Sequence, residues 1–451
     1  MTVGAQSGAT LELDDIQHFL VNRTPALAAR YEFLTFPTSG IGRAWLSGIL
    51  GKVGTARTVG AGPPDARWVT VAFTWNGLRS LGVCESSLET FPEEFRQGMA
   101  ARADIIGTTG PNAPEHWIGG LASPDLHAIV ILFARDVAER ERCREEHARF
   151  LQECGARLLS SLDLEALPPY DYAHEHFGYR DRLSQPVFEG TGEVPTPGSG
   201  GVLKAGEFFL GYEDETGVVP VLPKPDVLIR NGSYLAYFRL QEHVAAFRDF
   251  LRQNGTTEEA QELIAAKLMG RWRSGTPLVL SPDKDDPELG KDMQRNNDFN
   301  YKGMDPYGYR CPVGAHIRRM NLRDTGHNME RRRVIRRGGT YGPLLPQDAP
   351  EDEVERGVAG FVGCASIVRQ YEFAMNVWVN DAAFMDLGNE RDPIIGTQDS
   401  SFDFTMPKRP IKKTIKGLPA FTTVKGGAYF FLPGIKALRY LSAGASESSS
   451  S

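Results

Sequence analysis

Short hydrophobic runs, separated by polar or glycine-rich segments, recur along the whole 451-residue chain. The β-branched and aromatic runs at residues 68–75 (WVTVAFTW) and 127–133 (HAIVILF) predict strands, and the second is apolar enough to be buried. Apolar residues at helical spacing predict helices over residues 92–101 and 138–159. The first part of the chain is therefore expected to alternate strands with helices.

The second half repeats these kinds of element. Strands are predicted at residues 233–240, 360–368 and 428–432, and helices at residues 241–254, at 369–379 and in a short segment ending at 440. Each half of the chain therefore predicts an α+β layer, with helices packed on a largely antiparallel sheet.

The clearest internal break is the segment at residues 189–206 (EGTGEVPTPGSGGVLKAG), whose glycines and prolines cannot sustain a helix or a central strand. We place a domain boundary there, with an N-terminal domain over residues 11–195 and a C-terminal domain over 196–442. The small polar residues 1–10 and the serine-rich tail 443–451 predict disorder.

Composition narrows the classes of function. A net charge of −7 argues against a nucleic-acid partner, which usually requires a basic surface. The longest strongly apolar stretch, at residues 126–134, is too short for a bilayer, which needs about 20 residues, so no membrane is expected. We see no secretory signal at the N-terminus, and the five scattered cysteines form no disulfide framework, so a reducing, cytoplasmic compartment is expected.

Three polar segments carry the candidate chemistry. Asp181 lies between two arginines in residues 177–186 (FGYRDRLSQP), His316 lies in a stretch of small and apolar residues within 298–323, and five arginines crowd residues 331–343. Taken singly, each has a structural interpretation: a turn aspartate, a satisfied histidine and a solvated basic face.

Taken together, the segments resemble the dye-decolorising peroxidase family. Residues 178–186 match its GxxDG loop with a trailing Gln-Pro, 311–318 match its Cys-Pro-x-x-Ala-His-Ile-Arg segment, and 335–342 match Ile-Arg-Arg-Gly-x-x-Tyr-Gly. The resemblance extends over roughly residues 11–441, and the cytoplasmic, longer-chain branches of the family are the most similar.

The resemblance implies two ferredoxin-like α+β domains with antiparallel sheets and peripheral helices, and a haem b between them. It also implies a haem-dependent peroxidase that reduces hydrogen peroxide and oxidises dyes, phenols or similar aromatic donors through a ferryl intermediate. The physiological donor and the oligomeric state stay open.

On the proximal side, the resemblance assigns the haem iron to His316. The other ring nitrogen of His316 needs a partner, for which Asp392 is a candidate. Arg318 is a candidate for pairing with a haem propionate.

On the distal side, Asp181 would move the peroxide proton and Arg336 would stabilise the developing charge, with the adjacent Arg337 as the alternative arginine. Arg182 replaces the last glycine of the loop motif, which puts the tight geometry of the loop in doubt.

A second departure concerns the surface above the haem. After Gly360 the family usually has leucine, a spacer and phenylalanine, whereas this chain has Phe361, Val362 and Gly363. We therefore expect Phe361 and Gly363 to contact the haem, and Gly363 to leave the pocket wider than is usual.

Two alternatives share the expected haem. One is another haem reaction on the same fold, such as oxygenation or chlorite decomposition, and the other is a haem-binding or storage protein. A paired aspartate and arginine favours peroxide cleavage, and storage would not require that pair.

Overall fold

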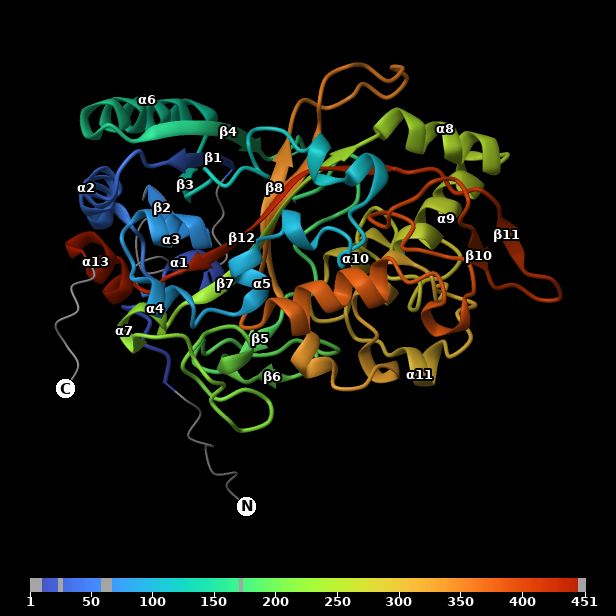
Figure 1. Cartoon of the computed structure of the whole chain (residues 1–451). Coiled ribbons are helices and arrows are strands. Elements are labelled where there is room, and N and C mark those ends of the chain that lie inside the picture. Colours follow the sequence, from blue (N-terminus) through green and yellow to red (C-terminus); the bar gives the residue numbers. More distant parts are fainter. Residues whose placement is uncertain (1–9, 23–26, 58–66, 170–172, 445–451) are drawn as a thin grey trace.

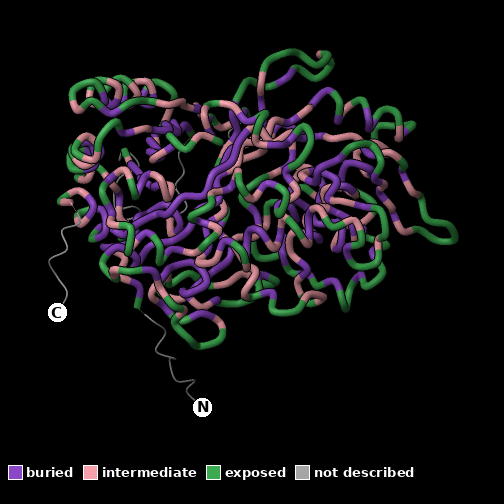
Figure 2. The backbone as a smooth tube through the Cα atoms, viewed as in Figure 1, coloured by how far each residue is buried: buried purple, intermediate pink, exposed green. Residues whose placement is uncertain are grey.

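A twisted antiparallel sheet runs through the middle of the molecule, and its inner strands are buried along most of their length (Figures 1 and 2). The computed structural model describes residues 10–22, 27–57, 67–169 and 173–444. Within these residues, eight strands pair in the order β4-β1-β3-β2-β12-β7-β9-β8. Their bounds are β1 (Ala28–Thr35), β2 (Trp68–Phe73), β3 (Ala128–Ala134), β4 (Arg157–Glu165), β7 (Ser233–Glu242), β8 (Ile335–Tyr341), β9 (Gly357–Cys364) and β12 (Thr422–Leu432).

The sheet consists of two sets of four strands. β1 to β4 precede the glycine- and proline-rich segment, and β7, β8, β9 and β12 follow it. The sets meet where β2 pairs with β12, with Phe73 opposite Phe431. This arrangement confirms the predicted α+β fold with antiparallel sheets.

The glycine- and proline-rich segment is itself folded. Two short parallel strands pair here, β5 (Val187–Phe188) just before the segment and β6 (Val202–Leu203) within it. Phe188 and Leu203 are buried in the core beside the main sheet. The exact boundary between the two halves stays a prediction. The termini at residues 1–9 and 445–451, for which disorder was predicted, lie outside the described residues.

Helices surround the sheet in both halves (Figure 1). The α-helices are α1 (His18–Val21), α2 (Ser39–Ile49), α3 (Trp75–Ser80), α4 (Glu85–Leu88), α5 (Glu93–Gln97), α6 (Val137–Cys154), α7 (Asp226–Ile229), α8 (Val244–Asn254), α9 (Glu258–Met269), α10 (Pro287–Lys291), α11 (Tyr301–Met304), α12 (His316–Met320) and α13 (Ile435–Ala443). Two π-helical segments, Ile367–Glu372 and Ala374–Val379, replace the single helix that was predicted at 369–379.

Two predicted helices are shorter than expected, and a glycine ends each of them. α5 ends before Gly98 (φ 77°) and α6 before Gly155 (φ 80°), backbone angles that glycine adopts without steric cost. Because α6 ends there, Leu158 and Leu159 lie in β4 and not in the helix.

Strands β1, β4 and β8 were not predicted. The sequence of β8, Ile-Arg-Arg-Gly-Gly-Thr-Tyr, is rich in arginine and glycine, and β8 is an edge strand with one neighbour. An edge strand tolerates charge on a face that is not packed, so hydrophobicity alone does not reveal it.

The two faces of the sheet have different coverings, and β9 shows this by the alternation of its side chains. Ala359 and Phe361 face the core that contains Phe19 of α1, which we call the α1 face. Val362 faces the core that contains Ile367 of the first π-helical segment. α12 packs against the second π-helical segment on that side, which we call the α12 face.

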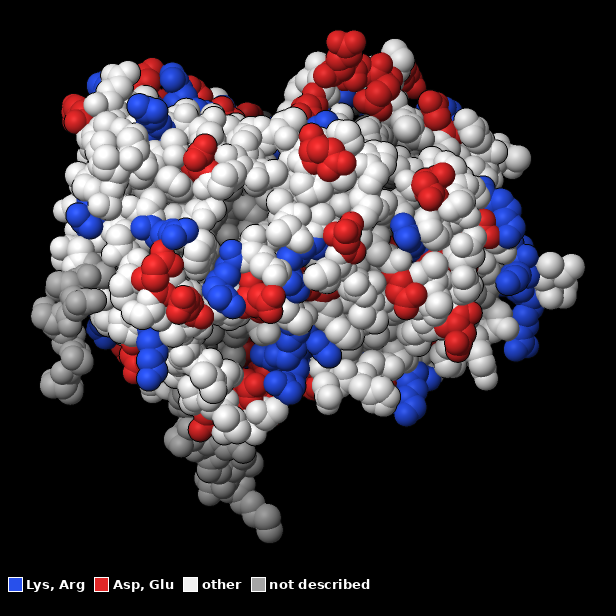
Figure 3. All heavy atoms as spheres, in the orientation of Figure 1, with Lys and Arg blue, Asp and Glu red and all other residues white. Residues whose placement is uncertain are grey.

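Charges of both signs cover the side of the molecule shown in Figure 3. Acidic side chains gather at the top, over the loop between β8 and β9, where residues 351–354 are exposed. Basic side chains gather at the right, over the hairpin of β10 (Phe404–Met406) and β11 (Lys413–Ile415). In the described part of the chain, no helix is long and apolar enough to cross a membrane.

Candidate functional site

His316 is the first residue of α12 and is held by a buried carboxylate. Its Nδ1 lies 2.9 Å from Asp392 Oδ2 and 3.1 Å from Asp392 Oδ1, which confirms the predicted pairing of these two residues. The side chain of His316 is 18% exposed, whereas that of Asp392 is fully buried. With Nδ1–H donating to the carboxylate, Nε2 is the ring nitrogen left to bind a metal ion.

Asp392 is ionised in this arrangement. Burial alone would raise the pKa of its carboxyl, but the His316 ring and the backbone N–H of Ile395 outweigh burial and lower the pKa below its usual value. Asp392 Oδ1 accepts hydrogen bonds from Ile394 N (2.9 Å) and Ile395 N (3.0 Å). A fixed carboxylate of this kind orients the imidazole and makes it a stronger metal ligand.

Arg318 was expected to pair with a haem propionate, but it lies in the protein interior. It is 1% exposed, its Nη1 donates to Cys311 O (2.8 Å) and Asp305 Oδ2 (3.3 Å), and its guanidinium lies 4.3 Å from the centre of the Tyr301 ring. Residues two apart on a helix point to different sides, so Arg318 stabilises the interior behind α12 while His316 faces elsewhere.

Asp181 ends a small hairpin at residues 173–181. Asp181 N donates to Ala173 O (2.8 Å), Arg180 N donates to Arg273 O (2.9 Å), and Gly178 turns the chain with φ 93°. Asp181 is exposed beyond this hairpin. Arg182, which replaces the motif glycine, adopts φ 61°, so the loop keeps its left-handed turn at a cost of roughly 1 kcal/mol.

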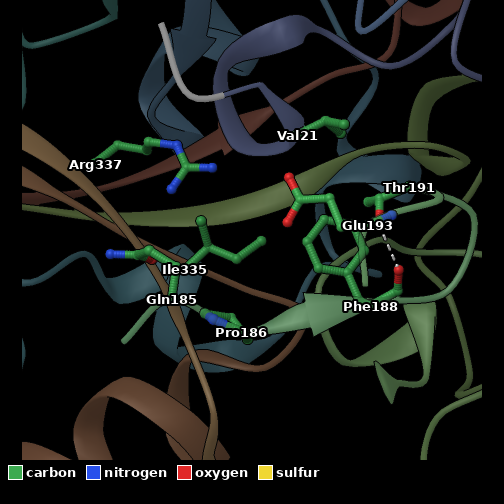
Figure 4. Close-up of a pocket in the computed structure, with 8 residues that line it drawn as sticks. All are labelled: Val21, Gln185, Pro186, Phe188, Thr191, Glu193, Ile335 and Arg337. Carbon is green, nitrogen blue, oxygen red and sulfur yellow. Dashed lines mark hydrogen bonds between the residues drawn. The ribbon is translucent and has the colours of Figure 1, made fainter. Parts of the chain in front are cut away.

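The two candidate arginines lie on opposite faces of β8. Arg336 Nη2 donates to Leu183 O (2.8 Å) and Arg336 N to Gln185 Oε1 (3.1 Å), so Arg336 contacts the segment that carries Asp181. Arg337 Nε donates to Phe19 O (3.0 Å) on the α1 face. Figure 4 shows the Arg337 guanidinium on the side of Val21, beyond Ile335. The geometry therefore favours Arg336 over Arg337.

Phe361 and Gly363 do not share the face of Arg336, contrary to expectation. Arg336 lies opposite Val362 in the β8–β9 pairing, so their side chains share the α12 face. The Phe361 ring packs on the α1 face, 5.3 Å from the ring of Phe19. A Cβ on Gly363 would lie 2.6 Å from Leu20 Cδ2 of α1. The alternation of β9 assigns Gly360 and Val362 to the α12 face instead.

Gly363 therefore has a packing role, which a substitution can test. Gly363→Phe is expected to lower the free energy of unfolding by about 1–3 kcal/mol or more, because the ring must displace Leu20 and α1. Thermal unfolding measures this change, and Val368→Phe at a 44% exposed position is the control. An unchanged melting temperature together with altered binding of iron ligands would instead indicate that Gly363 lines the haem pocket.

The α12 face of the second set of strands is apolar and incompletely covered. Phe238, Leu240, Val358 and Val362 are only half-buried there, although they lie on central strands. Gly338 and Gly360 face each other across β8 and β9, and a Cβ on Gly360 would lie 2.5 Å from Arg337 O. An apolar surface with two positions lacking side chains suits a large flat ligand.

A cluster of three arginines, one of them buried and two half-buried, borders this region. Burial, together with nearby Arg323, lowers the pKa of Arg271 to about 9, and burial with Arg323 and Arg336 lowers that of Arg333 to about 10. Arg271, Arg323 and Arg333 donate to backbone carbonyls and to the Asn297 amide. None forms an ion pair with a carboxylate of the described residues. Uncompensated buried guanidinium groups favour an anionic ligand.

A cavity of about 220 Å³ lies between this cluster and the Asp181 segment. Its walls include Ser184 and Gln185 from that segment, and Ser199 and Asn297, which accept hydrogen bonds from the arginines. Sequence analysis had singled out Arg336, but it had noted Arg333 only as part of a basic run. Arg271 and Arg323 were missed because nothing local distinguishes them from solvated arginines.

Comparison with known proteins connects this chain to one family. The chain is 31% identical over 414 residues to a dye-decolorizing peroxidase of Mycena epipterygia, covering 83% of this chain and 76% of the relative. It is 27% identical over 476 residues to the multifunctional dye peroxidase DyP2 of Amycolatopsis sp., covering 97% of each. No protein-family model matches the chain.

Solved structures show the same fold over nearly the whole chain. A dye-decolorizing peroxidase in complex with 2,6-dimethoxyphenol superposes with a TM-score of 0.86 at 26% identity, covering 96% of this chain and all of that one. A fungal DyP-type peroxidase from Auricularia auricula-judae superposes with a TM-score of 0.84, also at 26% identity and the same coverage.

Proposed function

This chain belongs to the dye-decolorising peroxidase family and is a haem peroxidase, and we propose that His316 holds its iron, with Asp181 and Arg336 acting on the peroxide. The observation that carries this assignment is the His316–Asp392 pair. His316 Nδ1 lies 2.9 Å from Oδ2 of the buried Asp392 carboxylate, which leaves Nε2 for a metal ion. We propose hydrogen peroxide as the oxidant and aromatic compounds, including phenols and dyes, as electron donors.

The residues present fit haem b. The half-buried apolar side chains of the α12 face match the macrocycle, and the buried arginines match the two propionates. Arg271, Arg323 and Arg333 replace Arg318 in this assignment, because Arg318 is already paired with Asp305. The sequence has no Cys-x-x-Cys-His motif, which supports a non-covalently bound haem.

When bound, the haem supplies the redox chemistry that cleaves the O–O bond of hydrogen peroxide. Asp181 would accept a proton from one oxygen of hydrogen peroxide and deliver it to the other oxygen, which leaves as water. Arg336, fixed by Leu183 O at 2.8 Å, would stabilise the negative charge that develops as the bond breaks.

Absorption spectroscopy tests this function against the alternatives. A purified protein with a Soret band that changes on adding one equivalent of hydrogen peroxide, and then recovers on adding a phenol, supports the peroxidase. A Soret band that does not respond to peroxide supports storage, and preferential decomposition of chlorite supports the other haem reaction.

Asp392→Asn is expected to weaken haem binding by about 10–100-fold, because the amide cannot make the imidazole a stronger ligand as the carboxylate does. The pKa of Asp392 is lowered in the folded protein. The hold of its carboxylate on the His316 ring, and the stability this gives the folded site, is therefore present above the usual aspartate pKa and is lost as the pH falls through the folded pKa. Haem titration of the apoprotein at several pH values measures both effects. Asp403→Asn, which removes a carboxylate paired with Lys416, is the control. Equal haem affinity in Asp392→Asn and wild type would contradict the assignment.

We also propose a cytoplasmic location. Cys84, Cys143, Cys154, Cys311 and Cys364 are all unpaired in the structure, and three of them are buried. Free thiols persist in reducing compartments.

A further inference from the structure

Two glutamates, the half-buried Glu175 and the buried Glu242, hold the hairpin that presents Asp181. Glu175 Oε1 accepts Tyr179 N (2.7 Å) and Glu175 Oε2 accepts Phe177 N (2.7 Å), so its carboxylate spans the turn of the hairpin. Glu242, at the end of β7 and 4% exposed, accepts His176 N at Oε2 (3.3 Å). The two carboxyl groups lie within hydrogen-bonding reach of each other.

Such a pair requires a proton, because two neighbouring buried carboxylates repel each other and lack solvation. Burial and the adjacent Glu175 raise the pKa of Glu242 well above its ordinary value. Burial also raises the pKa of Glu175, but the N–H groups of Phe177 and Tyr179 act in the opposite direction. Glu242 therefore carries the proton, and its O–H donates to the Glu175 carboxylate.

The other charged groups around the pair do not replace this proton. Asp181 adds a further negative charge, and His176, whose Nε2 lies 2.9 Å from Tyr341 O, is kept neutral because burial lowers its pKa to about 4. The cations nearby are already paired, Arg273 with Glu262 at 2.8 Å and Arg356 with Asp352 at 2.8 Å. His243, the residue after Glu242, is also neutral because burial lowers its pKa.

We propose that Glu175 and Glu242 form a proton-dependent latch that positions Asp181. While Glu242 is protonated, Glu175 stays bonded to Glu242 and to the turn, and the hairpin keeps Asp181 in place. When Glu242 releases its proton to solvent, the two carboxylates repel each other and the turn loosens. Because the folded pKa is raised, this hold is complete in acid and is lost as the pH rises through the folded value. The inference rests on the proposed role of Asp181.

Glu242→Gln tests the latch, because an amide donates a hydrogen bond to Glu175 at every pH. We expect the alkaline decline in the rate of reaction with hydrogen peroxide to move up by about one pH unit or more in this variant. Glu146→Gln, which removes a 42% exposed carboxylate of α6 that is paired with Arg67, is the control and should keep the wild-type decline. If the declines of Glu242→Gln and wild type coincide, and Glu242→Gln also leaves the infrared and cleavage results described below unchanged, the latch is wrong.

Infrared spectroscopy examines the proton without relying on catalysis. The wild type and Glu146→Gln should show the C=O stretch of a buried protonated carboxyl at neutral pH, and Glu242→Gln should lack it. Glu175→Gln provides a second variant: without the neighbouring negative charge, Glu242 should lose this band at a lower pH than in the wild type. Absence of the band in the wild type at neutral pH would overturn the proposal.

Limited proteolysis reports on the loop itself. Trypsin cleavage after Arg180 or Arg182 should accelerate with rising pH in the wild type and stay constant in Glu242→Gln. A cleavage rate independent of pH in both proteins would count against the latch. If Asp181 were not the proton acceptor, the infrared and cleavage results would stand and only the shift in peroxide kinetics would be absent, so the two failures are distinguishable.

Discussion

Asp181→Asn is expected to slow the reaction with hydrogen peroxide by about 10²–10⁴-fold, the usual effect of removing a general base. The amide keeps the size of the side chain but cannot accept the peroxide proton. Haem content and stability should not change, because Asp181 is exposed at the end of its hairpin and only its backbone N–H is bonded there, to Ala173 O. Stopped-flow absorption after mixing with peroxide measures the step directly.

The control for this prediction is Asp249→Asn, which removes an exposed carboxylate from α8.

A carboxylate stays ionised in mildly acidic solution, where a histidine base would be protonated, so we expect an acidic optimum for dye oxidation. Reaction of Asp181→Asn at the wild-type rate would remove Asp181 from proton transfer and leave Arg336 as the sole distal catalyst.

His316→Ala is expected to lose tightly bound haem. Loss of an outer partner of a metal ligand typically costs 10–100-fold in affinity, so removal of the ligand itself should weaken haem binding by more than about 100-fold. The Soret band of the purified variant should be weak or displaced. Added imidazole should restore part of it by occupying the space left by the side chain.

His327→Ala is the matched control, because His327 is exposed and lies eleven residues further along the same chain segment. Full haem occupancy with an unchanged spectrum in His316→Ala would exclude His316 as the ligand. Loss of haem in both variants would indicate a general loss of folding, which far-ultraviolet circular dichroism would detect.

Local sequence was sufficient to predict the fold class and to single out the residues that we propose for the chemistry. The runs at 68–75 and 233–240 became β2 and β7 because β-branched and aromatic side chains pack well on a pleated surface. The segments around Asp181, His316 and Arg336 were recognisable because their residue types and spacings are short-range properties of the chain. The pairing of His316 with Asp392 was also expected, although 76 residues separate them.

Tertiary structure decided on which face of the sheet each residue lies. Successive strand residues point to opposite faces of the sheet. Gly360 and Val362 therefore lie on the face of Arg336, where Phe361 and Gly363 had been expected, and Arg337 lies on the other face. The cluster of Arg271, Arg323 and Arg333 depends on contacts between distant segments, and so does the pairing of Glu175 with Glu242. Burial and the neighbours gained on folding give these ionisable groups their properties, and neither can be read from the residues beside them in the chain.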